Sequence, residues 1–134
     1  MADNYIHSDI SSQILKAYYK VFNKLGAGFL EKVYQKGLLI ELRKAGLKCY
    51  ESHPIQVFYD ETPIGVYYAD IIVEDCIIIE TKSVEYLRPE HDAQILNYLK
   101  ATDIEVGILL NFGLKPEIRR KVFSREFKDH HKKS

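Results

Sequence analysis

The segment IIVEDCIIIETKS, residues 71–83, determines how the rest of the chain is interpreted. Its two apolar runs, IIV and III, are separated by an acidic turn, which predicts two antiparallel strands joined by a short loop. The second run continues directly into Glu80, Thr81 and Lys82. Because side chains alternate along a strand, Glu80 and Lys82 are expected to share one face at the end of an otherwise buried strand.

The length of the turn determines where Asp70, in the preceding strand, points. With a two-residue loop, Asp70 would face Ile79 and point away from Glu80. With a three-residue loop or a bulge, Asp70 would lie directly across from Glu80. The sequence leaves both registers open.

In the second register, the carboxylates of Asp70 and Glu80 would repel each other unless a cation lay between them. Such oxygen ligands suit Mg²⁺ or Mn²⁺, which complete their coordination with water, phosphate oxygens and carbonyls such as that of Thr81. Lys82 is expected to be charged and to orient water or bind phosphate, whereas the metal ion is the expected activator of water. The alternative is a surface hairpin whose acid–lysine pairs contribute only about 0 to 1 kcal/mol.

Helical patterns come before and after this segment. Apolar spacing predicts one helix that begins at Ser8, as its N-cap, and ends near Gly26. A second helix is predicted after Gly28, with Gly46 as its C-terminal stop. A third is predicted from Pro89 to near Ala101.

The remaining elements complete a predicted α/β fold. A period of two between residues 47 and 82 predicts four strands, the first two of which are separated by Pro54. Residues 105–112 predict one more buried strand, and Pro116 is expected to begin a final helix. The predicted order, α-α-β-β-β-β-α-β-α, implies a mixed central sheet with helices on its faces.

The composition is that of a globular protein, with 46% hydrophobic and 28% charged residues in 134. A chain of this length suits a single domain over residues 1–134. No apolar run approaches the roughly 18 residues that span a bilayer, and residues 1–10 lack the features of a secretory signal, which predicts a cytoplasmic protein without a membrane segment. Cys49 and Cys76 lack a metal-site spacing and are expected to be buried hydrophobic residues.

The formal net charge of zero argues against a protein that coats nucleic acid by bulk electrostatics. Residues 115–134 nevertheless contain eight Lys or Arg residues against three acids. This segment is interpreted as a basic C-terminal arm, either solvated or in contact with phosphate.

The residues around Lys82 resemble a known signature. Asp70, followed by Glu80, Thr81 and Lys82 at the end of the next strand, is similar to the D…ExK signature of the PD-(D/E)XK nuclease superfamily. Ala69 stands where the superfamily's name has proline. The resemblance extends in order over about residues 8–123.

Two helical motifs add to the resemblance. GFLEKVY, residues 28–34, resembles the GxxExxY motif that names one branch of the superfamily. AQILNYLK supplies Gln94 and Tyr98, similar to the QxxxY motif of RecB-type nucleases. Both pairs, Glu31 with Tyr34 and Gln94 with Tyr98, share one helical face each.

The resemblance implies a restriction-endonuclease-like fold and a nuclease that uses Mg²⁺ or Mn²⁺ to hydrolyse DNA, with RNA the less expected substrate. Glu31 would add a third carboxylate at the metal, and Gln94 would hold Lys82 or DNA. Tyr34 is expected mainly to pack in the core, with its hydroxyl able to position Glu31. His91 is expected to be an exposed helix-start residue. The implied catalytic and metal-binding set is Glu31, Asp70, Glu80, Thr81, Lys82 and Gln94, supported by Tyr34 and Tyr98.

Other functions remain open at this level. A nuclease fold without turnover could serve as a nucleic-acid-binding or assembly module, because fold does not imply function. An unrelated α/β domain with accidental motifs would have the two-residue turn, with Asp70 facing away from Glu80. A core of this size often acts as a homodimer on a duplex, although no segment of the sequence identifies an interface.

Overall fold

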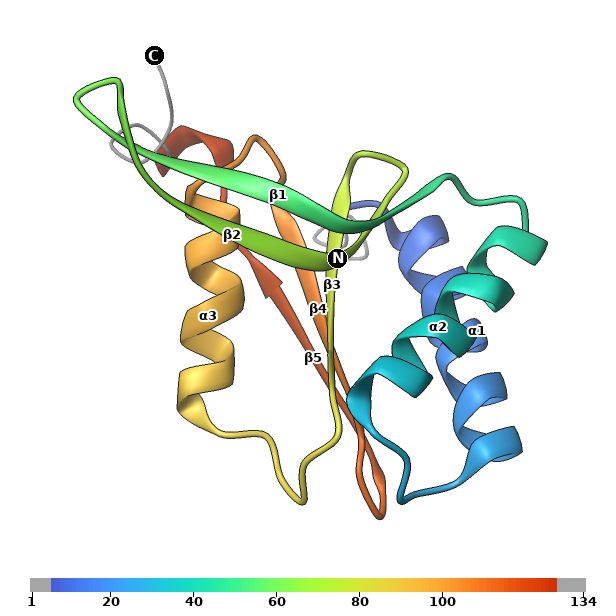
Figure 1. Ribbon diagram of the computed structural model, residues 1–134. Coiled ribbons are helices and arrows are strands. Elements are labelled where there is room, and N and C mark those ends of the chain that lie inside the picture. The colour runs from blue at the N-terminus through green and yellow to red at the C-terminus, as the bar shows by residue number, and fades with distance from the viewer. Residues whose placement is uncertain (1–5, 128–134) are drawn as a thin grey trace.

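The computed structural model describes residues 6–127, in which helices cover both faces of a five-stranded mixed sheet (Figure 1). Strand order is β1-β2-β3-β4-β5, with β3 and β4 parallel and the other neighbours antiparallel. The elements are α1 (Ser8–Leu25), α2 (Glu31–Lys44), β1 (Cys49–Tyr59), β2 (Thr62–Val73), β3 (Ile77–Lys82), α3 (Pro89–Lys100), β4 (Val106–Phe112), β5 (Pro116–Val122) and a 3₁₀ turn, η2 (Arg125–Phe127).

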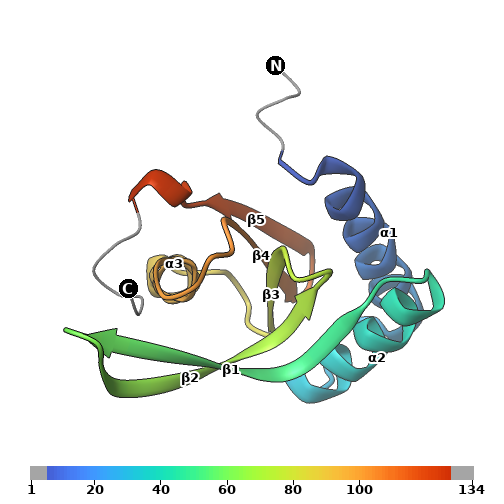
Figure 2. The ribbon, with the colours of Figure 1, turned by 90° about the horizontal axis from the view of Figure 1, so that it is seen from above.

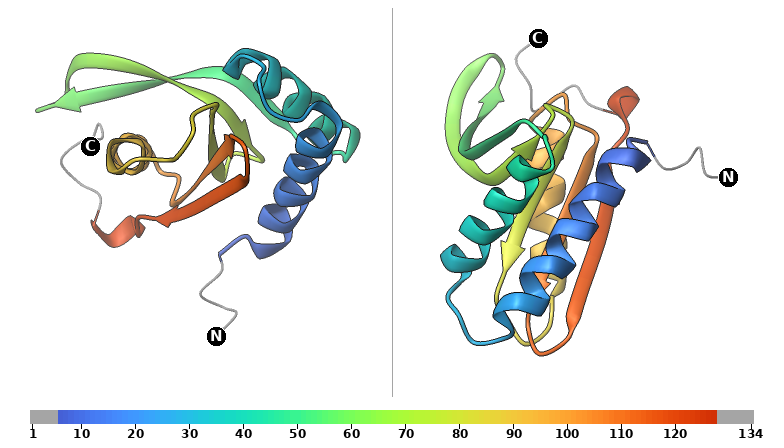
Figure 3. Two further views of the ribbon diagram at one scale, coloured as in Figure 1. Left: turned by 90° about the horizontal axis from the view of Figure 1, so that it is seen from below. Right: turned by 90° about the vertical axis from the view of Figure 1, so that its right-hand side faces the viewer.

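The two faces of the sheet are covered by different helices. Viewed from above, α1 and α2 lie on one side and α3 on the other (Figure 2). The views from below and from the side show α1 and α2 side by side over the same face (Figure 3). Among residues 6–127, no helix is both long and apolar enough to cross a membrane.

Burial on both faces explains the continuous apolar run of β3. Ile77 and Ile79 pack in the core under α1 and α2, whereas Ile78 packs in the core under α3. All three are fully buried, and each contributes roughly 1.5–3 kcal/mol of hydrophobic stabilisation. Alternation then directs Glu80 and Lys82 toward the α3 side of the sheet.

Helix α3 approaches the sheet closely because Gly107 of β4 has no side chain. A Cβ atom at this position would lie 2.8 Å from side-chain atoms of Ile95. Gly107 pairs with Ile78 of β3, so this close contact packs α3 against the sheet, and Gln94, next to Ile95, reaches Lys82.

The turn between β2 and β3 has the three-residue form. Val73 pairs with Ile77, and Ile71 pairs with Ile79. Glu74 and Asp75 adopt left-handed backbone angles, with φ of 53° and 57°. This register, continued by one residue, brings Asp70 across from Glu80, so the structure adopts the second of the two registers that the sequence left open.

The predicted break at Pro54 is wrong, because β1 runs continuously through it. Pro54 pairs with Tyr68 of β2, and β1 is an edge strand. An edge strand has one side without a neighbouring strand, so a residue that lacks an N–H is tolerated there. The region between residues 47 and 82 therefore forms three strands instead of four.

The predicted final helix is also wrong. Residues 116–122 form β5, which pairs with β4 along its whole length. Its period of two is carried by long side chains: Arg119 and Lys121 reach Asp92 of α3, whereas Arg120 donates a hydrogen bond to the Ile6 carbonyl on the other face. Much of the expected basic arm therefore belongs to the sheet, and residues 128–134 lie outside the described part of the chain.

The observed ends of α1 and α3 agree with the predicted ends within a residue or two. α1 begins at Ser8, but His7 is the N-cap residue, in the left-handed conformation. Cys49 is buried and Cys76 half-buried, and both are free thiols.

Candidate functional site

Hydrogen bonds join the carboxylates of Asp70 and Glu80 each to the other's strand. The Asp70 N–H donates to Glu80 Oε2 at 2.9 Å. In return, Asp70 Oδ2 accepts from the Thr81 N–H at 2.8 Å and from Thr81 Oγ1 at 3.0 Å. Within residues 6–127, the second oxygens, Asp70 Oδ1 and Glu80 Oε1, accept no hydrogen bond. Each carboxylate is therefore fixed by one oxygen and leaves the other available for a ligand.

The buried environment favours the protonated form of Glu80, which is only 3% exposed. Burial, followed by the nearby charge of Asp70, raises the pKa of Glu80 to about 8, although the Asp70 N–H and Lys82 oppose the shift. In the absence of another cation, this carboxyl is therefore mostly protonated at neutral pH.

Lys82 is held by a chain of hydrogen bonds from α3. Its Nζ donates to Gln94 Oε1 at 3.0 Å, and Gln94 Nε2 donates to the Tyr98 hydroxyl at 3.2 Å. Burial, followed by the charges of Glu80 and Asp70, raises the pKa of Tyr98 to about 12, so the hydroxyl is neutral. The pair of bonds sets the orientation of the Gln94 amide, which in turn positions the ammonium group beside the carboxylates.

Glu31 lies within electrostatic reach of both Asp70 and Glu80. It is the first residue of α2, and burial of its carboxyl raises its pKa, while Lys82 lowers it and Asp70 raises it. Within the described range 6–127, no three His, Cys, Asp or Glu side chains come together closely enough to hold a metal ion.

The GxxExxY residues fix the entry into α2. Tyr34 is fully buried with its ring stacked on Phe112, as expected for a core residue. Its hydroxyl donates to the Gly26 carbonyl and accepts from the Phe29 N–H at 3.1 Å, so it contacts the loop and not Glu31. Gly28 has φ of +109°, a conformation that favours glycine.

Ser83 ties this loop to the end of β3. Its hydroxyl donates to the Phe29 carbonyl at 3.0 Å. The start of α2, and with it Glu31, is thereby held beside Lys82.

Two polar contacts at the site were missed in the sequence analysis. Gln35, which is 2% exposed, donates from Nε2 to the Asp70 carbonyl at 3.3 Å and to Glu51 Oε2 at 3.4 Å. Its position four residues after Glu31, on the same helical face, was the available signal. The second is Thr81, whose N–H and hydroxyl hold Asp70, whereas the motif treats this position as variable.

His91 lies in the first turn of α3 and is half-buried. Its Nδ1 accepts from the Arg88 N–H at 2.9 Å, which satisfies a backbone donor at the start of the helix. Burial and then the charge of Lys82 lower its pKa. His91 therefore has a local structural contact and lies within electrostatic reach of the site.

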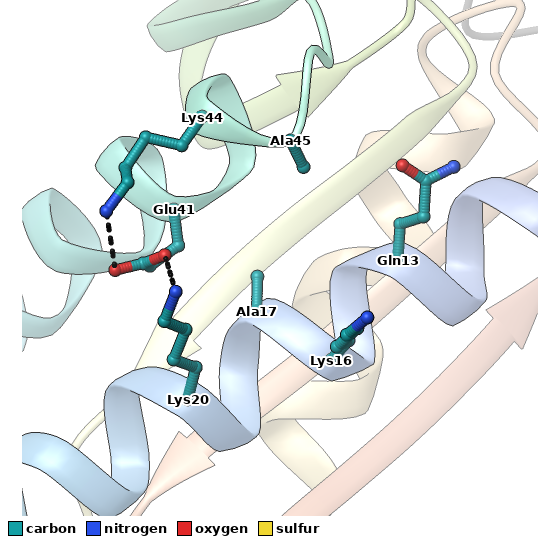
Figure 4. A pocket seen from close by; sticks show the side chains of 7 residues that line it. All are labelled: Gln13, Lys16, Ala17, Lys20, Glu41, Lys44 and Ala45. Carbon is teal, nitrogen blue, oxygen red and sulfur yellow. Dashed lines mark ion pairs between the residues drawn. The ribbon is translucent and has the colours of Figure 1, made fainter.

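A separate cavity of about 330 Å³ lies between α1 and α2 (Figure 4). It contains Glu41, which forms ion pairs with Lys20 at 3.1 Å and Lys44 at 3.9 Å. The hydrogen bond from Lys20 is the main cause of the lowered pKa of Glu41. The seven lining residues include none of the predicted site residues.

Comparison with known proteins agrees with this geometry. Residues 8–121 match the PD-(D/E)XK nuclease superfamily, and the chain therefore belongs to that superfamily. Its mixed sheet flanked by helices is consistent with the restriction-endonuclease-like fold. Neither a curated protein nor a solved structure matches the chain.

The donor atoms at the site fit a divalent cation, which nucleases of this superfamily generally use. Asp70 and Glu80 would provide two hard carboxylate ligands, each with one oxygen that accepts no hydrogen bond within residues 6–127. A cation between them would also compensate the repulsion and burial that raise the pKa of Glu80. Two carboxylates are sufficient for Mg²⁺, which commonly keeps several water ligands.

Proposed function

We propose that the protein is a metal-dependent nuclease that hydrolyses phosphodiester bonds in DNA. The observation that supports this most directly is the arrangement of Asp70 and Glu80 across β2 and β3, with Lys82 one alternation further along β3. Two carboxyl groups placed this way, with one of them buried, are unfavourable when both are ionised unless a cation lies between them.

Asp70, Glu80 and the Thr81 carbonyl would hold Mg²⁺ or Mn²⁺, and Glu31 would assist either directly or through a bound water. When bound, the metal ion would lower the pKa of a coordinated water and offset negative charge on the phosphate. The hydrogen bonds from Thr81 and Asp70 hold the two carboxylates in place before any ligand arrives. Such preorganisation reduces the rearrangement needed during the reaction.

Lys82 would orient the attacking water or stabilise charge that develops on the phosphate oxygens. Its Nζ is held by Gln94, and Gln94 is in turn held by Tyr98. Hydrolysis of phosphate esters requires acceleration at the upper end of the enzymatic range, which a single lysine does not provide. The lysine and the metal-binding carboxylates are therefore proposed to act together.

Two helix N-termini would help to bind the phosphate. α2 begins at Glu31, which interacts electrostatically with Asp70 and Lys82. α3 begins at Pro89, and its His91 interacts electrostatically with Lys82 and Arg88. The positive ends of both helix dipoles therefore add to the charge of Lys82 in favouring an anion.

We also assign the chain to the GxxExxY branch of the superfamily. The support is the backbone conformation of Gly28 and the contacts of Tyr34, which together set the position of Glu31.

The test is a cleavage assay with labelled single-stranded, duplex and branched DNA and with RNA, in Mg²⁺ or Mn²⁺. Glu80→Gln and Lys82→Ala should abolish cleavage, whereas the control Glu41→Gln, which alters a glutamate on the same helix as Glu31, should retain it. All variants should first be shown to fold by circular dichroism.

Absence of metal-dependent cleavage by the wild type on every substrate would refute the proposal. Retained nucleic-acid binding in that case would favour the alternative, a nuclease fold that serves as a binding or assembly module.

A further inference from the structure

The hairpin formed by β1 and β2 extends beyond the rest of the sheet and past α3 (Figures 1 and 2). Near the sheet, Ile55 and Ala69 are buried against α3. The hairpin also exposes large apolar and aromatic side chains. Tyr67 and Tyr68 lie across from Ile55 and Pro54, and Val66, Ile64 and Tyr59 lie nearer the tip. An extended element with this much exposed aromatic surface suits contact with a ligand.

The charge of the hairpin is unsuited to the backbone of a nucleic acid. Residues 49–69 contain no Lys or Arg, and their acids are Glu51, Asp60 and Glu61. Contacts to phosphates are made mainly by basic groups, which this segment lacks. A nucleic acid that touches the hairpin would therefore do so through its bases.

Tyr67 connects the hairpin to the site. It lies in β2, three residues before Asp70, and is 45% exposed. Its ring centroid is 5.4 Å from that of Tyr98, the residue whose hydroxyl holds Gln94 and, through it, Lys82. A base stacked on the exposed part of Tyr67 would therefore lie next to the residues that position the lysine.

The basic groups lie at the other elements around the site. Lys32 follows Glu31 at the start of α2, and Arg88 precedes α3. A strand that passes Lys82 would accordingly turn its phosphates toward these helix starts and its bases toward Tyr67. Bases are free to turn in this way only where they are unpaired.

We infer that the β1–β2 hairpin is a base-binding element and that Tyr67 is a stacking residue which selects single-stranded DNA, or unpaired stretches of it, as the substrate. This inference rests on the proposed function and specifies its substrate class. Binding would occur by stacking, which does not depend on the base sequence because every base has an apolar face.

Binding can be measured apart from cleavage, in proteins that all carry Glu80→Gln. Fluorescence anisotropy would follow a labelled single-stranded oligonucleotide of mixed sequence, its duplex, and an abasic strand of the same length. Tyr67→Ala should weaken single-strand binding about 5- to 140-fold, the range expected for loss of one stacked base, and Tyr67→Phe should restore it. The abasic strand should bind weakly and respond little to either change.

Tyr19→Ala is the matched control. Tyr19 is 42% exposed on α1 and has its own ring neighbour, Tyr18, at 5.2 Å, but it lies on neither the hairpin nor α3. This variant should bind the single strand as tightly as the protein that carries only Glu80→Gln.

Equal binding of single strand and duplex, or equal binding by the Tyr67→Ala and control proteins, would overturn the inference. Wild-type cleavage of duplex in those circumstances would leave the proposed nuclease function standing. Conversely, Tyr67-dependent single-strand binding without any cleavage by the wild type would support the base-binding element and refute the nuclease activity.

Discussion

The raised pKa of Glu80 should make the stability of the metal-free protein depend on this one carboxyl. A glutamate with a folded-state pKa of about 8, against an ordinary value of 4.5, binds a proton more tightly in the folded state. Its contribution to stability is therefore fully present below the unfolded pKa and is lost as the pH rises through about 8. The shift corresponds to a loss of up to about 5 kcal/mol.

Replacement by glutamine removes the titration while keeping the shape and the acceptor for the Asp70 N–H. At about pH 5, wild type and Glu80→Gln should have similar free energies of unfolding, because both side chains are neutral in the folded state. At about pH 9 without metal, Glu80→Gln should be the more stable by several kcal/mol, and added Mg²⁺ should stabilise the wild type but not the variant.

Urea denaturation followed by circular dichroism measures this difference, with a chelator and then with Mg²⁺. Glu85→Gln, at an exposed glutamate in the loop after β3, is the control and should follow the wild type. If wild type and Glu80→Gln lose stability in parallel between the two pH values, Glu80 does not bind a proton in the folded state. The inference of a cation site from the Asp70–Glu80 pair would then fail.

Three further variants test the supporting contacts. Tyr98→Phe should lower kcat more than it raises KM, because it frees the Gln94 amide, and a double mutant with Gln94→Ala should be less impaired than the two single effects combined; equal effects on kcat and KM with full additivity would argue against a shared role. Thr81→Val should weaken Mn²⁺ binding in a calorimetric titration, since Asp70 loses one hydrogen bond, and Thr81→Ser should restore it; unchanged affinity in Thr81→Val would contradict the role of the hydroxyl. Gln35→Leu should lower the free energy of unfolding by about 1–3 kcal/mol, because it leaves the Asp70 carbonyl without its side-chain donor; an unchanged urea midpoint would show that this contact is dispensable.

The hairpin turn shows where sequence patterns reach their limit. Alternation correctly grouped Glu80 with Lys82, but a turn of two or three residues fits the segment equally well. The longer turn has left-handed backbone at Glu74 and Asp75, and the mutual hydrogen bonds of Asp70, Glu80 and Thr81 stabilise the register that it sets. These hydrogen bonds are tertiary contacts, which a periodic pattern in the sequence does not reveal.

The error at β5 has a different origin. Pro116 and the charged residues after it are typical of a helix start, and only Ile118 and Val122 provide an apolar signal for a strand. The strand is selected by pairing with β4 and by the contacts of Arg119 and Lys121 with Asp92. Local propensity is a weak guide where long basic side chains join an edge strand to α3 on one face and to the segment before α1 on the other.

Gln35 and Tyr34 show how one helix serves both the core and the site. Tyr34 was predicted as a core residue, and its apolar ring gave the signal. Gln35 is polar, and it is buried because its side chain donates a hydrogen bond to the Asp70 carbonyl, on a strand far away in sequence. The role of such a residue can be recognised only from the folded structure, in which its partner strand lies beside it.

The central claim is that Asp70 and Glu80 together bind a divalent metal ion. Electron paramagnetic resonance of Mn²⁺ titrated into the wild type, Asp70→Asn and Glu80→Gln at neutral pH measures this without any substrate. We expect a single bound ion in the wild type, no bound ion at the same concentrations in either variant, and retained binding in the control Glu41→Gln. Equal Mn²⁺ binding by the wild type and both site variants would contradict the claim.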